Sequence, residues 1–102
     1  MNKRLALHEK LKSIVGNNNV YFQPPASVSI SYPCVIYSVG NGDVKRADDT
    51  VYGYINSYQV TFISKKPDVD IVERVLTALP MCSVSRIYVA DNLNHYVFNL
   101  YY

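Results

Sequence analysis

The last ten residues, Leu93–Tyr102, read LNHYVFNLYY and alternate with a period of two. Successive side chains of a strand point to opposite faces, so this pattern indicates a strand. One face carries Tyr96, Phe98, Leu100 and Tyr102. We therefore predict a strand that packs this aromatic face into the core and holds this end of the chain in a sheet, with no separate C-terminal functional element.

The opposite face of the same strand is chemically mixed. It carries His95, Val97, Asn99 and Tyr101. A face of this composition suits a neighbouring subunit better than water, because interfaces combine aromatic, aliphatic and neutral polar groups. We expect this side of the sheet to be covered by other copies of the chain.

Length and charge limit what the chain can be. Its 102 residues are enough for one domain with one core. The ten basic and eight acidic residues, a formal charge of +2, are scattered along the chain rather than gathered into the basic field of a typical nucleic-acid binder. Ten tyrosines without a tryptophan favour half-buried strands and protein interfaces.

Cysteine usage and hydropathy predict a protein of a reducing cytoplasm. Cys34 and Cys82 lie far apart in the sequence, each within an apolar segment. We expect them to be small buried hydrophobic residues, and not to form a disulfide, act as a nucleophile or bind zinc. No stretch approaches the roughly 18 apolar residues of a membrane span, and the N-terminus leads into a charged amphipathic segment rather than a signal-peptide core.

The first half of the chain predicts a helix and two strands. A one-sided apolar pattern over residues 5–15, ended by Gly16, indicates a helix that lies on another element. Residues 20–23 form a short β-prone run cut off by two prolines, which predicts an edge strand or strap. The run Tyr32–Val39 is apolar on both faces and indicates a central strand.

The second half predicts an α+β arrangement. Residues 55–64 form a strand with Tyr58, Val60 and Phe62 toward the core, and Gln59, Thr61 and Ile63 toward solvent or a partner. Gly40–Tyr54 is too long for a hairpin loop and predicts a protruding β-arm or flap. A helix with Asp68 as its N-cap runs to Pro80, and a final hairpin pairs residues 83–89 with 94–102.

Catalytic and metal-binding patterns are weak throughout. His8 and His95 show no spacing that brings them to each other or to a carboxylate, so we expect an exposed helix histidine and a histidine on the sheet surface. The arm residues Asp43, Asp48 and Asp49 lack the alternation of a calcium loop. Gly40 to Gly42 lead into no helix that could hold a phosphate. We predict no enzyme activity, no metal and no cofactor.

Four segments resemble a known family. They are Leu7–Glu9, Asn19–Pro25 (NVYFQPP), Tyr32–Tyr37 (YPCVIY) and Ala90–Tyr102 (ADNLNHYVFNLYY). Together they span nearly the whole chain, and they resemble the small tail-completion proteins of long-tailed phages, which include tail terminators and head-tail joining proteins. These strings carry structural rather than catalytic content.

The resemblance implies a single domain, 1–102, that serves as a structural virion protein. Its fold would be a curved, mainly antiparallel sheet flanked by two helices, with a long arm around residues 40–54. It would form a homohexameric ring at the head-proximal end of the tail, in the neck region. Its partners would be its own copies, the tail tube protein, and the head connector or a head-completion protein. DNA would pass through the ring only as cargo, no membrane would be involved, and the protein would be made in the host cytoplasm.

A closed ring needs two different surfaces on each subunit. We assign one to the arm and the other to the open strand face. The residues predicted for these contacts are Asp43, Lys45, Arg46, Asp48, Asp49, Tyr52, Gln59, Thr61 and Tyr101.

Two other functions remain open from the sequence. Tyrosines and lysines together could stack and hold single-stranded nucleic acid, so a small nucleic-acid-binding module is the alternative. A small hydrolase or nuclease that uses His8 or His95 with Glu9 or Asp91 is a more remote one.

Overall fold

The computed structural model describes residues 3–40, 45–46, 54–55 and 57–102. Helices and strands alternate irregularly along the chain, which gives the α+β class predicted from the sequence. The elements are α1 (Lys3–Val15), β1 (Val20–Phe22), β2 (Cys34–Val39), β3 (Lys45–Arg46), β4 (Tyr54–Ile55), β5 (Ser57–Ser64), α2 (Ile71–Ala78), β6 (Cys82–Ala90) and β7 (Leu93–Tyr101).

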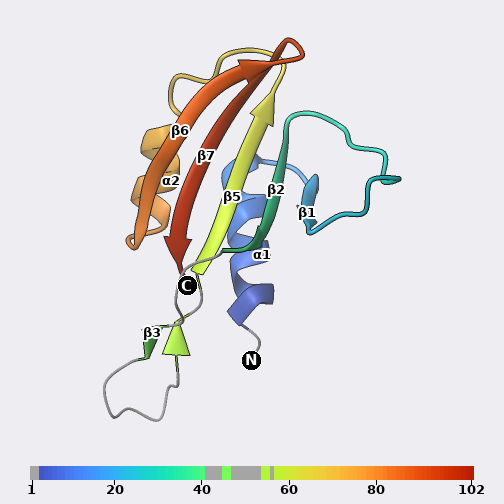
Figure 1. Ribbon diagram of the computed structural model, residues 1–102. Coiled ribbons are helices and arrows are strands. Elements are labelled where there is room, and N and C mark those ends of the chain that lie inside the picture. The colour runs from blue at the N-terminus through green and yellow to red at the C-terminus, as the bar shows by residue number, and fades with distance from the viewer. Residues whose placement is uncertain (1–2, 41–44, 47–53, 56) are drawn as a thin grey trace.

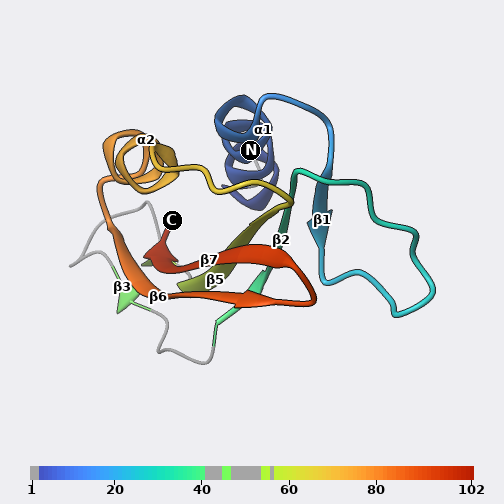
Figure 2. The same cartoon turned by 90° about the horizontal axis from the view of Figure 1, so that it is seen from above.

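Five strands form one open, twisted sheet in the order β1-β2-β5-β7-β6 (Figure 1). Only the β1–β2 pair is parallel, and the other three pairings are antiparallel. Both helices lie on the same face of this sheet, as the view from above shows (Figure 2). The mainly antiparallel sheet with two helices is therefore confirmed, and the helices leave its other face without a helical layer.

The core lies between the helices and the sheet. Both predicted core faces are confirmed, since the alternating aromatic and aliphatic residues of β5 and β7 are buried there. Helix α1 contributes Leu7 and Leu11, and α2 contributes Ile71 and Val75. Phe62 and Phe98 meet edge to face with their centroids 5.7 Å apart. Such pairs add roughly 0.5–1.5 kcal/mol beyond the area that they bury.

The prediction that Asp68 caps the second helix is wrong. Helix α2 begins at Ile71, and Asp70 occupies the N-cap without a side-chain capping bond. Asp68 instead accepts the Asp70 N–H at 3.2 Å and both Arg74 amino groups, at 3.3 and 2.9 Å. A carboxylate two residues before the N-cap can form such a local turn and still bond to a side chain of the helix. Asp68 therefore stabilises the start of α2 from two residues before the N-cap, and not from the N-cap itself.

Strand boundaries also differ from the sequence prediction. β2 begins at Cys34 rather than Tyr32, and the predicted strand of residues 55–64 divides into β4 and β5, which pair with different strands. The final hairpin is confirmed. Asp91 and Asn92 form its two-residue turn with φ values of 53° and 61°. These residue types tolerate positive φ, as a two-residue hairpin turn requires.

The prediction that His8 is an exposed helix histidine is wrong. Its Nδ1 lies 2.8 Å from the hydroxyl oxygen of Tyr37, a side chain that is only 1% exposed. Arg4 donates to the same hydroxyl at 3.3 Å, and its guanidinium lies over the Phe22 ring. Burial, followed by the charges of Lys12 and Arg4, lowers the pKa of His8. The neutral imidazole can then accept a hydrogen bond from the Tyr37 hydroxyl, and this bond joins α1 to β2.

This contact makes stability depend on pH. A histidine with a lowered folded-state pKa stabilises the fold above its unfolded pKa of about 6.5, and this contribution is lost as pH falls toward the folded value. We expect the free energy of unfolding to drop between pH 7.5 and 5.5, and the drop to be smaller in His8→Gln. Urea unfolding at both pH values measures it. An equal drop in both proteins would contradict the assignment.

Candidate functional site

The helix-free face of the sheet brings together three of the residues predicted for subunit contact. Gln59 pairs with Asn99, and Thr61 and Tyr101 occupy positions of the same face on β5 and β7. Gln59 and Asn99 are exposed, whereas Thr61 and Tyr101 are half-buried. These four groups are neutral and can donate and accept hydrogen bonds, so this part of the face can bind another protein without the desolvation of a charge.

Part of this face is buried within the subunit, so the prediction that all of it is open to solvent or a partner is wrong. Ile63 is 7% exposed and Val97 is 2% exposed, although both were predicted to face solvent or a partner. Cys34, the cross-strand partner of Ile63, is fully buried. Next to this apolar group the rings of Tyr88 and His95 stack in parallel at 4.6 Å. Alternation along one strand predicts which face a residue takes, but not how deeply its side chain is buried there.

The predicted arm is described only in part. β3 and β4 form a separate two-stranded ladder in which Lys45 pairs with Ile55 and Arg46 with Tyr54. This ladder lies beyond the end of the main sheet (Figure 1). The other arm residues predicted for subunit contact lie outside the described residues, so their role stays a prediction. They are Asp43, Asp48, Asp49 and Tyr52.

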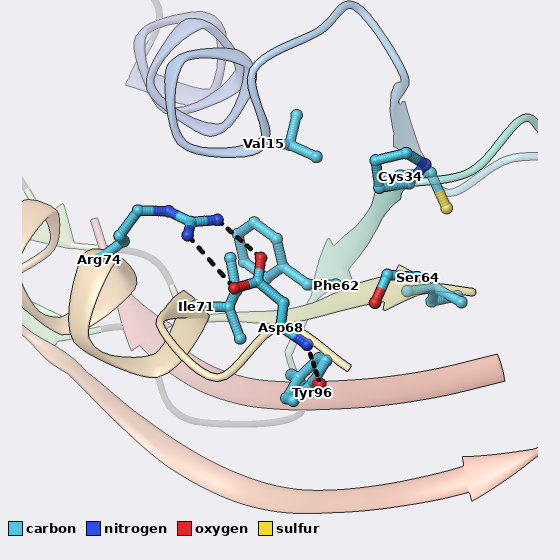
Figure 3. Close-up of a pocket in the computed structure, with 10 residues that line it drawn as sticks. Val15, Cys34, Phe62, Ser64, Asp68, Ile71, Arg74 and Tyr96 are labelled. Carbon is cyan, nitrogen blue, oxygen red and sulfur yellow. Dashed lines mark hydrogen bonds and ion pairs between the residues drawn. The ribbon is translucent and has the colours of Figure 1, made fainter. Parts of the chain in front are cut away.

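A small cavity of about 50 Å³ lies where α2 meets the sheet (Figure 3). On one side of it the Asp68 carboxylate holds Arg74, and the backbone N–H of Asp68 donates to the Tyr96 hydroxyl at 2.9 Å. The opposite wall includes Cys34 and Ser64. This volume accommodates a few water molecules rather than a substrate.

The polar groups around this cavity are hydrogen-bonded to one another, an arrangement that stabilises the fold rather than activating a group for reaction. The hydrogen bond from Arg74 is the main cause of the lowered pKa of Asp68, against the opposing effect of burial. Burial raises the pKa of the Cys34 thiol to about 11, so its nucleophilic thiolate is scarce at neutral pH. We interpret the cavity as a junction between α2 and the sheet.

The two histidines lie on opposite sides of the sheet. His8 contacts Tyr37 under the helical layer, whereas His95 lies on the helix-free face and donates from Nδ1 to the Leu93 carbonyl at 3.0 Å. Glu9 pairs with Lys12 at 3.0 Å. Within the part of the chain that the structure describes, no three histidine, cysteine or acidic side chains gather as metal ligands.

Comparisons with known proteins add no family assignment: no family model matches the sequence, and no curated protein matches it. Among the described residues, no helix is long and apolar enough to cross a membrane.

Thiol chemistry tests the interpretation of the cavity. Both cysteines are free, and burial raises the pKa of each thiol to about 11. At pH 7 only about one thiol in ten thousand is then ionised. We expect iodoacetamide to modify Cys34 in the native protein at least 100-fold more slowly than in the urea-unfolded protein. Mass spectrometry of timed samples measures this ratio, and comparable rates would show an accessible, reactive thiol.

Proposed function

We propose that this protein is a structural virion component of the tail-completion class, which forms a ring at the head-proximal end of a phage tail. There it would terminate the tail tube, join the tail to the head, or do both. The observation that carries the proposal is the one-sided helical cover of the sheet. It leaves Gln59, Asn99 and Tyr101 on a helix-free face that another subunit can contact.

The distribution of surfaces supports a ring. A heterologous contact closes into a ring only when each subunit offers two different patches. The helix-free face is one, and the ladder of β3 and β4 lies away from it, beyond the end of the main sheet (Figure 1). Gln59 and Asn99 can form hydrogen bonds across such an interface, while partly buried Tyr101 can provide the apolar contact.

A small nucleic-acid-binding module is the alternative. Arg86 lies over the Tyr88 ring at 4.9 Å, a pairing of cation and aromatic ring that also occurs on single-strand binding surfaces. Tyr88 also stacks on His95, however, so one face of this ring is covered within the sheet and cannot stack on a base. Steep salt-dependent binding of DNA by the isolated monomer would favour the alternative.

Deletion of the gene from its phage tests the proposal. We expect filled heads to accumulate beside separate tails, with overlong tubes if the protein terminates the tail and tubes of normal length if it joins tail to head. Electron microscopy of lysates distinguishes these outcomes. Infectious particles at the normal titre without the gene would overturn the proposal.

Complementation with variants tests the helix-free face. We expect Gln59→Arg to lower the titre of the deletion phage at least 10-fold, because a buried unpaired charge opposes subunit contact. Glu73→Arg, an exposed change on α2, is the matched control and should restore the titre. Equal titres with both variants would show that this face makes no essential contact.

A further inference from the structure

Strand β6 forms a long open edge of the main sheet. It is the last strand in the order β1-β2-β5-β7-β6, so among the described strands it pairs only with β7. Every residue from Ser83 to Val89 is exposed. An antiparallel strand bonds its neighbour through alternate residues, so the remaining residues of β6 direct their N–H and C=O groups outward. An extended strand can pair with these outward groups.

From Ile87 to Val89 the side chains of this edge are apolar or aromatic. Ile87 is 55% exposed and Val89 is 68% exposed, and Tyr88 between them is 37% exposed. Edge strands that stay unpaired commonly carry lysine or proline, and β6 has neither. Its single charge is Arg86, and its only irregularity is a bulge between Val84 and Arg86. The stretch after the bulge is therefore an uninterrupted, mostly apolar strand edge.

Among the described residues, the one exposed strand edge long enough to pair with β6 along its length is β6 of another copy. β1, at the other side of the sheet, has three residues and is soon followed by Pro24 and Pro25, while β3 and β4 have two residues each. We propose that β6 of one copy pairs with β6 of a second copy, antiparallel about a two-fold axis at Tyr88, so that two sheets become one.

The bulge fixes the register of this pairing. Ala90 and Leu93 flank the two-residue turn and form a hydrogen-bonded pair. Because alternate residues bond to the same neighbour, Ala90, Tyr88 and Arg86 bond to β7. Val89 and Ile87 therefore direct their backbone N–H and C=O groups outward. The bond from Tyr101 N–H to the Met81 carbonyl continues the same alternation beyond the bulge. The regular stretch, residues 86–90, pairs fully with itself only when Tyr88 lies opposite Tyr88.

This register matches the side chains as well as the backbone. Ile87 of each copy lies opposite Val89 of the other, so the two most exposed aliphatic side chains of the strand cover each other. The two Tyr88 rings form a central aromatic pair, a favourable cross-strand contact. Arg86 lies opposite Ala90, which keeps the two positive charges apart. Centring the axis on Arg86 would instead place like charges directly opposite each other.

The contact is small, so the dimer forms in a concentration-dependent way. Standard interfaces use about 20–30 residues on each side, whereas the ladder uses five residues of each copy. The β6 pairing does not depend on the proposed ring, because a two-fold contact pairs identical patches and a ring contact joins different ones. A protein that does not complete tails could still pair through β6, and loss of the pairing could leave tail completion intact.

A cysteine placed on the two-fold axis tests the register. Directly opposed residues in a non-hydrogen-bonded antiparallel pair have Cα atoms about 4.5 Å apart, within disulfide range, whereas diagonal positions lie about 7–8 Å apart. In a Cys82→Ser background, we expect Tyr88→Cys to form a disulfide-linked dimer under mild oxidation at least 10-fold faster than Ile87→Cys. Non-reducing gels of the full chain measure both rates.

Controls separate this result from random collision. Val84→Cys lies before the bulge and should crosslink as slowly as Ile87→Cys. Val89→Lys, combined with Tyr88→Cys, should slow crosslinking at least 10-fold, and circular dichroism should show that this variant is folded. Fastest crosslinking through Ile87→Cys, equal rates at all three positions, or no effect of Val89→Lys would each overturn the proposed pairing.

Discussion

The structure depends on the packing of one sheet face against two helices that approach it from the same side. β7 lies between β5 and β6 and places the fully buried Phe98 at the centre of this layer. Replacing such a side chain with alanine typically costs about 3–5 kcal/mol, a large part of the stability of a domain of this size. Because α1 and α2 both pack here, neither helix of the described residues covers the other face.

This one-sided cover explains where the remaining features lie. The His8–Tyr37 contact joins α1 to β2, and the Asp68–Arg74 pair organises the entry to α2, so the polar groups near the helices serve to attach them. The helix-free face carries neutral polar residues around a small apolar group, and β6 ends the sheet with an exposed edge. Both surfaces are suited to assembly, and neither presents a catalytic arrangement among the described residues.

The sequence was informative where periodicity alone determines the outcome. Alternation in residues 93–102 and 55–64 correctly identified the core faces of β7 and β5, and Asp91 and Asn92 correctly marked the final turn. Contacts between distant segments were not predictable in this way. The bond between His8 and Tyr37 joins residues 29 positions apart. The burial of Val97, on the face that the helices leave open, likewise does not follow from alternation. Of the proposed contact residues, the structure brings Gln59, Thr61 and Tyr101 onto one face.

Amide hydrogen exchange along β6 tests most directly whether this open edge is built to be covered by a second copy. In dilute solution the outward amides of Ile87 and Val89 should exchange rapidly, while those of Arg86 and Tyr88, bonded to β7, should exchange slowly. Raising the protein concentration should slow Ile87 and Val89 and leave Arg86 and Tyr88 unchanged. Exchange at Ile87 and Val89 that is independent of concentration, or already as slow as at Tyr88 in dilute solution, would contradict this account.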